Sequence, residues 1–256
     1  MRYLILFFAL LSPITLLAQS EGTVEYSVTN EMKMDMETIM ANLPEEMQSD
    51  SAMVAQMAQT FENMGNQQVT ITMLLHYSGA QALLETVMPE LPRSLPNVSP
   101  FGSFDNNLGM TAYFDFDERT SITKMPNTGE SVPYVVSREL NTIDLLDWVL
   151  VDVDSTILGH AVKKAEFISD SLEAVVWYAP GIASTAGPEQ FANLPGIPLS
   201  IDAVMSQDMY MKTNFVAISI TEGLEEPITP PVGILVTEEE YMKIMMEKMG
   251  SIQFVP

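Results

Sequence analysis

The sequence has 256 residues, no cysteine and a formal net charge of −23 at pH 7. A chain without cysteine has no disulfide, no thiolate metal site and no lipidated cysteine, so a hydrophobic core has to hold the fold together. The strong negative charge disfavours binding to nucleic acid or to anionic lipid surfaces.

Residues 1–18 are predicted to be a secretory signal peptide. Arg2 supplies the positive start, Tyr3 to Leu17 is a mostly apolar stretch, and Ala18 is a small residue suited to cleavage. The apolar stretch is interrupted by polar residues and a proline, and it is shorter than the roughly 20 residues that a membrane-spanning helix needs. We therefore expect residues 19–256 to form one exported β-rich domain, periplasmic or extracellular, without a membrane span.

Alternation of apolar and polar residues predicts long strands. It runs from Val24 to Met36 with Asn30 as the only break, and a period of two places one set of side chains on an apolar face and the other in water. At about 3.3 Å per residue such a strand would be roughly 40 Å long. The same pattern recurs in three further segments: Val69, Ile71, Met73, Leu75 and Tyr77; Met110, Ala112, Phe114 and Phe116; and Val216, Ile218 and Ile220.

One-sided alternation favours antiparallel pairing, because parallel strands are normally covered on both faces and appear as continuous apolar runs. The expected fold class is therefore mainly β (α+β). We expect a curved, one-sided antiparallel sheet or half-open barrel with a few helices packed on it.

Two segments have the apolar spacing of helices. The first is an insertion near residues 38–64, where Met53, Val54, Met57, Phe61 and Met64 recur at helical intervals. The second lies near residues 238–249, where Thr237 and Glu240 have the spacing of a capping box. It continues into a stripe of four methionines: Met242, Met245, Met246 and Met249.

Three sequence blocks carry a family resemblance: ILGHAVKKAEF at Ile157 to Phe167, VVWYAPGI at Val175 to Ile182, and GPEQFANLPGIPLSI at Gly187 to Ile201. In this order they resemble the signature blocks of the GLPGLI family of exported bacterial proteins. The opening GTVEYSV and the closing VTEEEYMKIM are similar to the ends of that family, so the resemblance covers most of the mature chain. It implies a fold like the half-open antiparallel barrel of periplasmic lipoprotein carriers, and it brings no assigned activity.

The signature positions are Gly159, Lys164, Trp177, Tyr178, Gly187, Pro188, Leu194, Pro195 and Gly196. We interpret them as a folding element, a strand, a turn and a second strand held by an aromatic pair. The chain departs from the family pattern at three positions. Asn193 replaces a turn glycine and suits a positive φ, Pro198 predicts irregular strand pairing, and Val162 stands where many members carry cysteine.

Methionine is the unusual residue, with 20 in the chain. Met fills irregular apolar space and adapts to varied partners. The leading hypothesis is a noncatalytic protein that binds a lipid, a lipoprotein or a hydrophobic polypeptide. The candidate lining residues are Met32, Met34, Met36, Val69, Ile71 and Met73. The alternative is Cu(I) binding or buffering, because Met32, Met34 and Met36 form a Met-x-Met-x-Met run of thioethers.

Catalytic motifs are absent from the sequence. The two histidines, His76 and His160, have no partner at metal-ligand or triad spacing, and we expect no cofactor. Carboxylate pairs at Asp115 with Asp117 and at Asp152 with Asp154 are each expected on one face of a strand. They leave open a second alternative, an uncharacterised hydrolase that uses one of these pairs.

Overall fold

The computed structural model describes residues 20–33, 69–87, 110–125, 131–141, 145–206 and 210–250. The predicted signal peptide, residues 1–18, and the predicted helical insertion, residues 38–64, lie outside these ranges.

The described residues form twelve strands and one helix. The strands of the amino-terminal half are β1 (Glu21–Lys33), β2 (Val69–Ser78), β3 (Gln81–Val87), β4 (Thr111–Asp115), β5 (Thr120–Lys124) and β6 (Tyr134–Glu139). The remaining elements are β7 (Val149–Ile157), β8 (His160–Ile168), β9 (Leu172–Ala179), β10 (Ile197–Ser206), β11 (Tyr210–Glu222), β12 (Ile234–Thr237) and helix α4 (Glu238–Gly250).

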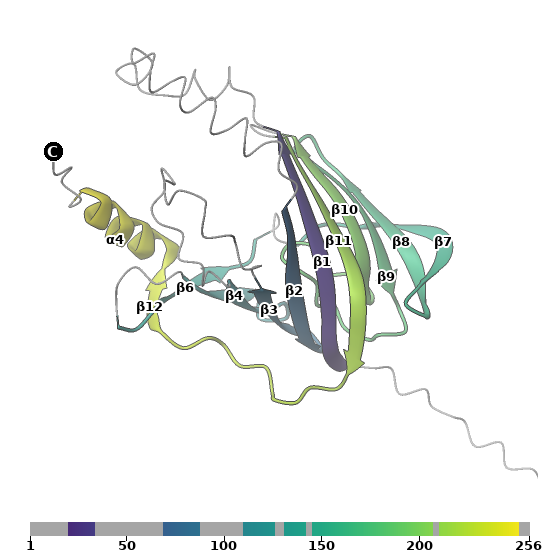
Figure 1. The fold of residues 1–256 in the computed structure, drawn as a ribbon, viewed down its shortest axis with the longest axis horizontal. Helices are drawn as coiled ribbons and strands as arrows, with labels where there is room; N and C mark the ends of the chain where they lie inside the picture. The colour runs from purple at the N-terminus through teal and green to yellow at the C-terminus, as the bar shows by residue number, and fades with distance from the viewer. Residues whose placement is uncertain are drawn as a thin grey trace, which may run out of the picture.

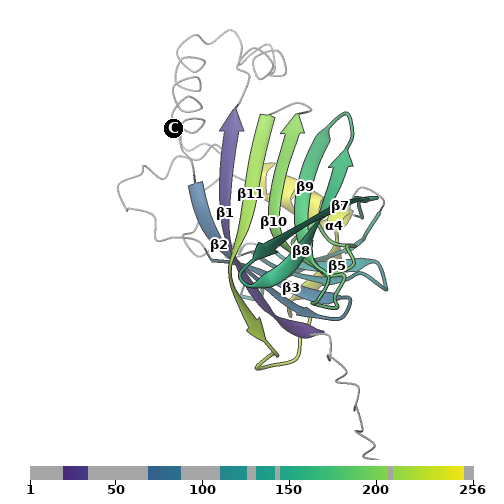
Figure 2. The ribbon, with the colours of Figure 1, turned by 90° about the vertical axis from the view of Figure 1, so that its right-hand side faces the viewer.

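All twelve strands belong to one open sheet with the order β12-β6-β5-β4-β3-β2-β1-β11-β10-β9-β8-β7. Neighbouring strands are antiparallel, except that β12 runs parallel to β6. The long strands β1 and β8–β11 lie side by side, and the half that contains β3–β6 turns away from them at a steep angle (Figures 1 and 2). The predicted mainly β, curved antiparallel fold is confirmed.

The inner face of the sheet is the apolar face that the alternation predicts for β1. Val24, Tyr26 and Val28 are fully buried, and the residues between them keep partial exposure. Their neighbours on the adjoining strand β2, Met73, Leu75 and Tyr77, are buried in the same core. Two of these side chains, Val28 and Met73, also line the candidate site described below.

The prediction for β11 was right for Ile220, which packs against the core, and wrong for Val216 and Ile218. Val216 and Ile218 are 41% and 48% exposed, whereas Phe215 and Ala217 are buried. The pairing of β1 with β11 shifts between Glu25 and Tyr26, so that one extra residue of β11 is accommodated there. Such a β-bulge reverses the inward and outward alternation along the strand, which a period of two read from sequence does not reveal.

Tyr26 and Tyr77 make a matched pair of fully buried phenols. The Tyr26 hydroxyl donates a hydrogen bond of 2.6 Å to the carbonyl of Pro198. The Tyr77 hydroxyl has no partner among the described residues. Burial raises the pKa of Tyr77 to about 12 and raises that of Tyr26 further, so both remain neutral over the pH range in which proteins are stable.

We expect Tyr26→Phe to lower the free energy of unfolding by about 1–2 kcal/mol, because it leaves a buried carbonyl without its donor. Tyr77→Phe serves as the control and is expected to change stability by less than about 0.5 kcal/mol or to increase it, since no hydrogen bond is lost. Urea denaturation of both variants measures the difference. Equal destabilisation by the two substitutions would contradict the assignment of partners.

Helix α4 begins with the capping box. The backbone N–H of Thr237 donates to Glu240 Oε2 at 2.8 Å, and the N–H of Glu240 donates to Thr237 Oγ1 at 3.2 Å. The helix packs on β6 and β12, with the ring of Tyr241 6.0 Å from that of Tyr134. The predicted methionine stripe is wrong at Met242, which is exposed, and Tyr241 makes the buried contact instead. Met245 is half-buried, and the side chains of Met246 and Met249 lie outside the described part of the helix. No helix in the described part of the chain is long and apolar enough to cross a membrane.

Candidate ligand-binding cavity

The segment between β9 and β10, residues 180–196, folds as a loop against the inner face of the sheet. Four of its apolar side chains are buried in the core: Ile182, Ala186, Phe191 and Leu194. The Phe191 ring meets the ring of Phe215 on β11 edge to face, with centroids 5.7 Å apart. The loop therefore supplies one wall of the core rather than a surface connection between two strands.

Hydrogen bonds from distant parts of the chain hold this loop in place. Ser184 Oγ donates to the carbonyl of Gly79 in the β2–β3 turn at 2.5 Å. Trp148 Nε1 donates to the carbonyl of Ala192 at 2.9 Å. Buried backbone carbonyls need such partners, so these two side chains link the loop to both halves of the sheet.

Two glycines of the loop sit where a side chain has no room. A Cβ at Gly187 would lie 2.3 Å from the carbonyl oxygen of Phe191, and one at Gly196 would lie 2.2 Å from that of Ala179. Gly196 also has a φ of 151°, which side-chain-bearing residues rarely adopt. These close approaches explain why two of the signature positions are glycine.

A partly open cavity of about 330 Å³ lies between this loop and the sheet. Ligand sites in proteins commonly measure about 300–1,000 Å³, so this one suits a small ligand or part of a larger one. Strands β1, β2, β3, β10 and β11 contribute to the wall together with the loop, and the lining residues are Val28, Asn30, Ile71, Met73, Thr86, Met110, Glu189, Gln190, Phe191, Ala203, Met205, Met211, Thr213 and Phe215.

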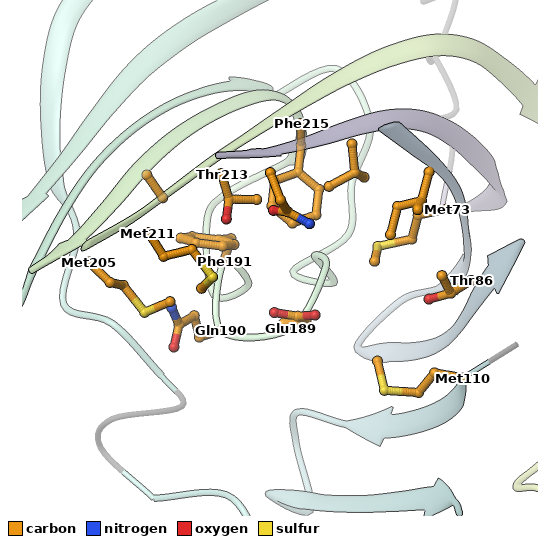
Figure 3. A pocket seen from close by; sticks show the side chains of 14 residues that line it. Met73, Thr86, Met110, Glu189, Gln190, Phe191, Met205, Met211, Thr213 and Phe215 are labelled. Atoms are coloured by element: carbon orange, nitrogen blue, oxygen red, sulfur yellow. The ribbon is translucent and has the colours of Figure 1, made fainter. Parts of the chain in front are cut away.

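Four methionines give the cavity a flexible apolar lining. Met73 and Met110 lie on one side of it and Met205 and Met211 on the other, with Glu189 between them on the loop (Figure 3). Unbranched thioether side chains can change conformation to fit ligands of different shape. The lining therefore suits an apolar ligand body without fixing its exact outline.

Glu189 is the one ionisable residue in the described part of the lining. Its side chain has free surface because it faces the cavity, yet its carboxyl is surrounded by protein atoms, and this desolvation raises its pKa above the ordinary value of 4.5. No described residue donates a hydrogen bond or forms an ion pair with it. Since folding raises the pKa, this group favours the folded state most at pH below 4.5 and less as pH rises through the folded-state pKa.

The structure brings two of the six predicted ligand-binding residues to the cavity, Ile71 and Met73. Met34 and Met36 lie outside the described residues, and only the backbones of Met32 and Val69 are described. In register, Met32 is paired with Met211, which lines the cavity.

Sequence reasoning missed most of the lining. The residues from β10, β11 and the loop, including Met205, Met211 and Glu189, were not among its candidates. A weak signal existed in the sequence, because Met205 and Met211 lie within six positions of each other at the facing ends of β10 and β11. Nothing local showed that the loop would fold back over them.

The signature residues divide between the loop and the outer strands. Gly159 lies in the two-residue turn between β7 and β8, and Lys164 on β8 forms an ion pair of 2.5 Å with Glu166. Tyr178 is buried and its neighbour Trp177 is half-buried on the other face of β9. Pro188 and Leu194 are buried in the loop and Pro195 is exposed. Trp177 and Tyr178 thus face opposite sides of β9, and the role of the signature as a folding element stays a prediction.

Two of the predicted irregularities of this region appear in the structure. Asn193, which replaces the turn glycine, has a positive φ of 64°. The pairing of β10 with β9 shifts between Pro198 and Ser200, as expected for a residue that cannot donate to the ladder.

The carboxylate pair Asp115 and Asp117 does not lie on one face of a strand, so that expectation was wrong. Asp115 ends β4 and accepts hydrogen bonds from Gln81 Nε2 at 3.0 Å and from the N–H of Glu118 at 3.0 Å. These hydrogen bonds, above all the one from the backbone N–H of Glu118, lower the pKa of the Asp115 carboxyl. Asp117 is exposed in the turn that follows, so Asp115 has the role of a turn cap.

The second pair, Asp152 and Asp154, lies on the edge strand β7 and contacts one lysine. Lys163 Nζ is 3.6 Å from Asp152 Oδ1 and 3.2 Å from Asp154 Oδ1. All three side chains are accessible to solvent, so the pairing has the weak energy of a surface ion pair.

His76 is half-buried on β2. Its Nδ1 is 2.8 Å from Thr23 Oγ1 and its Nε2 is 3.3 Å from Glu85 Oε2. Within the described ranges, no group of three His, Asp or Glu side chains is placed to hold a metal ion.

No family model matches the sequence, and no curated protein matches it. Among solved structures, PNGF-II in a C2 crystal form aligns with a TM-score of 0.50 and 12% identity over 88% of this chain and 33% of that chain. PNGF-II in a P21 form gives a TM-score of 0.48 and 13% identity over 88% and 34% of the two chains. The LolA superfamily protein NE2245 from Nitrosomonas europaea gives a TM-score of 0.35 and 10% identity over 81% and 88%.

The chain spans about a third of the length of PNGF-II. At 12% identity the C2 alignment concerns the fold alone, because one fold hosts many unrelated functions. The chain thus forms an open, curved, mainly antiparallel sheet whose inner face carries a loop and a methionine-lined cavity.

Proposed function

We propose that this protein is an exported, noncatalytic binding protein of the bacterial envelope that holds a lipid or another hydrophobic ligand in the cavity between the sheet and the loop. The observation that carries the proposal is the lining itself. Four methionines, two phenylalanines and three smaller aliphatic side chains surround an accessible space of about 330 Å³. Apolar sites with a few polar groups are the usual form of a small-molecule site.

The cavity is built from elements that the fold already holds rigid. Val28, Met73 and Phe215 belong to the fully packed core of the sheet, and Phe191 is fixed by its ring contact with Phe215. Preorganised walls reduce the entropy lost on binding. The quoted sequence blocks support a place in the GLPGLI family, and the apolar amino-terminal stretch supports export.

The two alternatives from the sequence receive less support. Neither carboxylate pair is accompanied by a nucleophile and base among the described residues: Asp115 caps a turn and Asp152 and Asp154 share Lys163. Cu(I) binding through Met32, Met34 and Met36 stays a prediction, since the side chains concerned are not described.

Nile red, a neutral dye that fluoresces in apolar sites, tests the proposal. We expect the wild-type protein to bind it with micromolar affinity and Ala203→Phe to weaken this at least about tenfold, because residue 203 lines the cavity and a ring there would occupy it. Ala161→Phe is the matched control, since Ala161 is exposed on β8 and outside the lining.

Thermal melting establishes that both variants fold before their affinities are compared. Absence of saturable dye binding by the wild-type protein would contradict the proposed function. Equal binding by wild type and Ala203→Phe would place the apolar site elsewhere on the molecule. Lipid extraction of protein purified from its own host then identifies the natural ligand by mass spectrometry.

A further inference from the structure

Among the described residues that line the cavity, one is charged, Glu189, and none is a counter-ion for it. Glu189 extends from the loop into the space between the methionines (Figure 3). The other polar side chains of the described lining, Asn30, Thr86, Gln190 and Thr213, are neutral, and no Lys, Arg or His is among the described lining residues. The described lining therefore carries negative charge and no positive charge.

We propose that the cavity selects amphiphiles with a cationic, hydrogen-bond-donating head, a primary amine on an apolar chain, and that the Glu189 carboxylate receives this head. The inference rests on the proposed function, because it names the class of ligand that the same cavity would take. An ammonium group offers three donors to a carboxylate that accepts none from the described residues.

The backbone conformation of Glu189 also supports a role in binding. Its φ of 52° lies in the left-handed region, which costs a residue with a side chain about 1 kcal/mol or more relative to glycine. The nearby Asn193 also has a positive φ, but asparagine tolerates that region well. Glutamate at position 189 is therefore unfavourable for the backbone, and its carboxyl is partly desolvated. Local strain of this kind clusters at binding sites.

An anionic head is disfavoured at this position. A fatty-acid carboxylate in the cavity would lie near the Glu189 carboxyl with no basic residue in the described lining to compensate, and like charges in a partly desolvated site repel. The overall charge of −23 adds an attraction for cations over long range. Both effects favour an amine over an acid of equal chain length.

Three eight-carbon ligands that differ only in the head group test this inference: octylamine, octanol and octanoate. Displacement of Nile red, at ligand concentrations below micelle formation, measures the affinity of each. We expect wild type to bind octylamine about tenfold or more tightly than octanoate, with octanol between them. Glu189→Gln should weaken octylamine binding about tenfold and leave octanol unchanged. Glu189→Lys should reverse the order of amine and acid.

Glu173→Gln is the matched control. Glu173 is exposed on β9 and is not a lining residue, so its substitution changes the net charge by the same amount away from the cavity. Its octylamine affinity should equal that of wild type. Retained octanol binding shows that each Glu189 variant keeps an intact cavity.

Octanoate binding as tight as octylamine binding, or an equal loss in the Glu189 and Glu173 variants, would overturn the proposed head-group preference and leave the proposed function standing. If Nile red itself does not bind to the wild-type protein, no displacement can be measured. The proposed function then fails, and the head-group preference fails with it.

Discussion

Phe191→Ala is expected to lower the free energy of unfolding by about 3–5 kcal/mol, the range for removing a large buried aromatic side chain. The ring is 3% exposed, packs edge to face on Phe215, and joins the loop to the sheet. Its loss leaves empty space beside the existing cavity, so the site becomes larger while its wall becomes less firmly held. Domains are typically stable by only about 5–15 kcal/mol, so this change is a large fraction of the total.

Chemical denaturation followed by tryptophan fluorescence measures this effect. Phe191→Leu keeps most of the apolar volume and should cost clearly less than Phe191→Ala. Ile168→Ala is a surface control, since Ile168 is 74% exposed, and it should change stability by less than about 0.5 kcal/mol. A cost below about 1 kcal/mol for Phe191→Ala would mean that the loop does not pack on the sheet as described.

Gly187→Ala is expected to lower the free energy of unfolding by about 2–3 kcal/mol, because the added methyl group has to displace backbone atoms. The nearest atoms to the new Cβ would be the Phe191 carbonyl oxygen at 2.3 Å and the Ala192 Cα at 2.8 Å. Backbone cannot rotate away as the end of a side chain can, so the turn from residue 187 to residue 192 would have to open. We expect weaker Nile red binding as a second consequence, because this turn carries Glu189, Gln190 and Phe191 into the cavity.

Gly181→Ala is the matched control within the same loop. A Cβ at Gly181 would meet no atom within 4 Å, so this substitution should leave stability within about 0.5 kcal/mol and dye affinity unchanged. Thermal melting and dye titration of the two variants side by side measure the contrast. Similar behaviour of both would remove the close backbone approach at Gly187 as the reason for glycine there.

The outcomes of the sequence predictions follow the range over which each signal acts. The burial of Val24, Tyr26 and Val28 and the capping box of Thr237 with Glu240 were predictable because they depend on neighbours within a few residues. The outward orientation of Val216 was not predictable. A bulge opposite Glu25 and Tyr26, nearly 200 positions earlier in the chain, sets the alternation of β11.

The candidate site shows the same division. Ile71 and Met73 were identified because they lie on the apolar side of an alternating strand. Glu189 and Phe191 were not, because a segment rich in proline and glycine carries no periodic pattern. Their positions depend on contacts between distant segments, among them the hydrogen bonds of Ser184 to Gly79 and of Trp148 to Ala192.

The sequence by itself determined a mainly β chain with long antiparallel strands, an acidic surface and a methionine-rich apolar set, because alternation and composition are local properties of the chain. Only the tertiary structure decided that residues 180–196 fold back against the inner face of the sheet, and that one carboxyl lies among the methionines. Hydrogen bonds and packing between residues as much as 105 positions apart fix that arrangement. Such long-range contacts leave no periodic trace in the sequence of the loop.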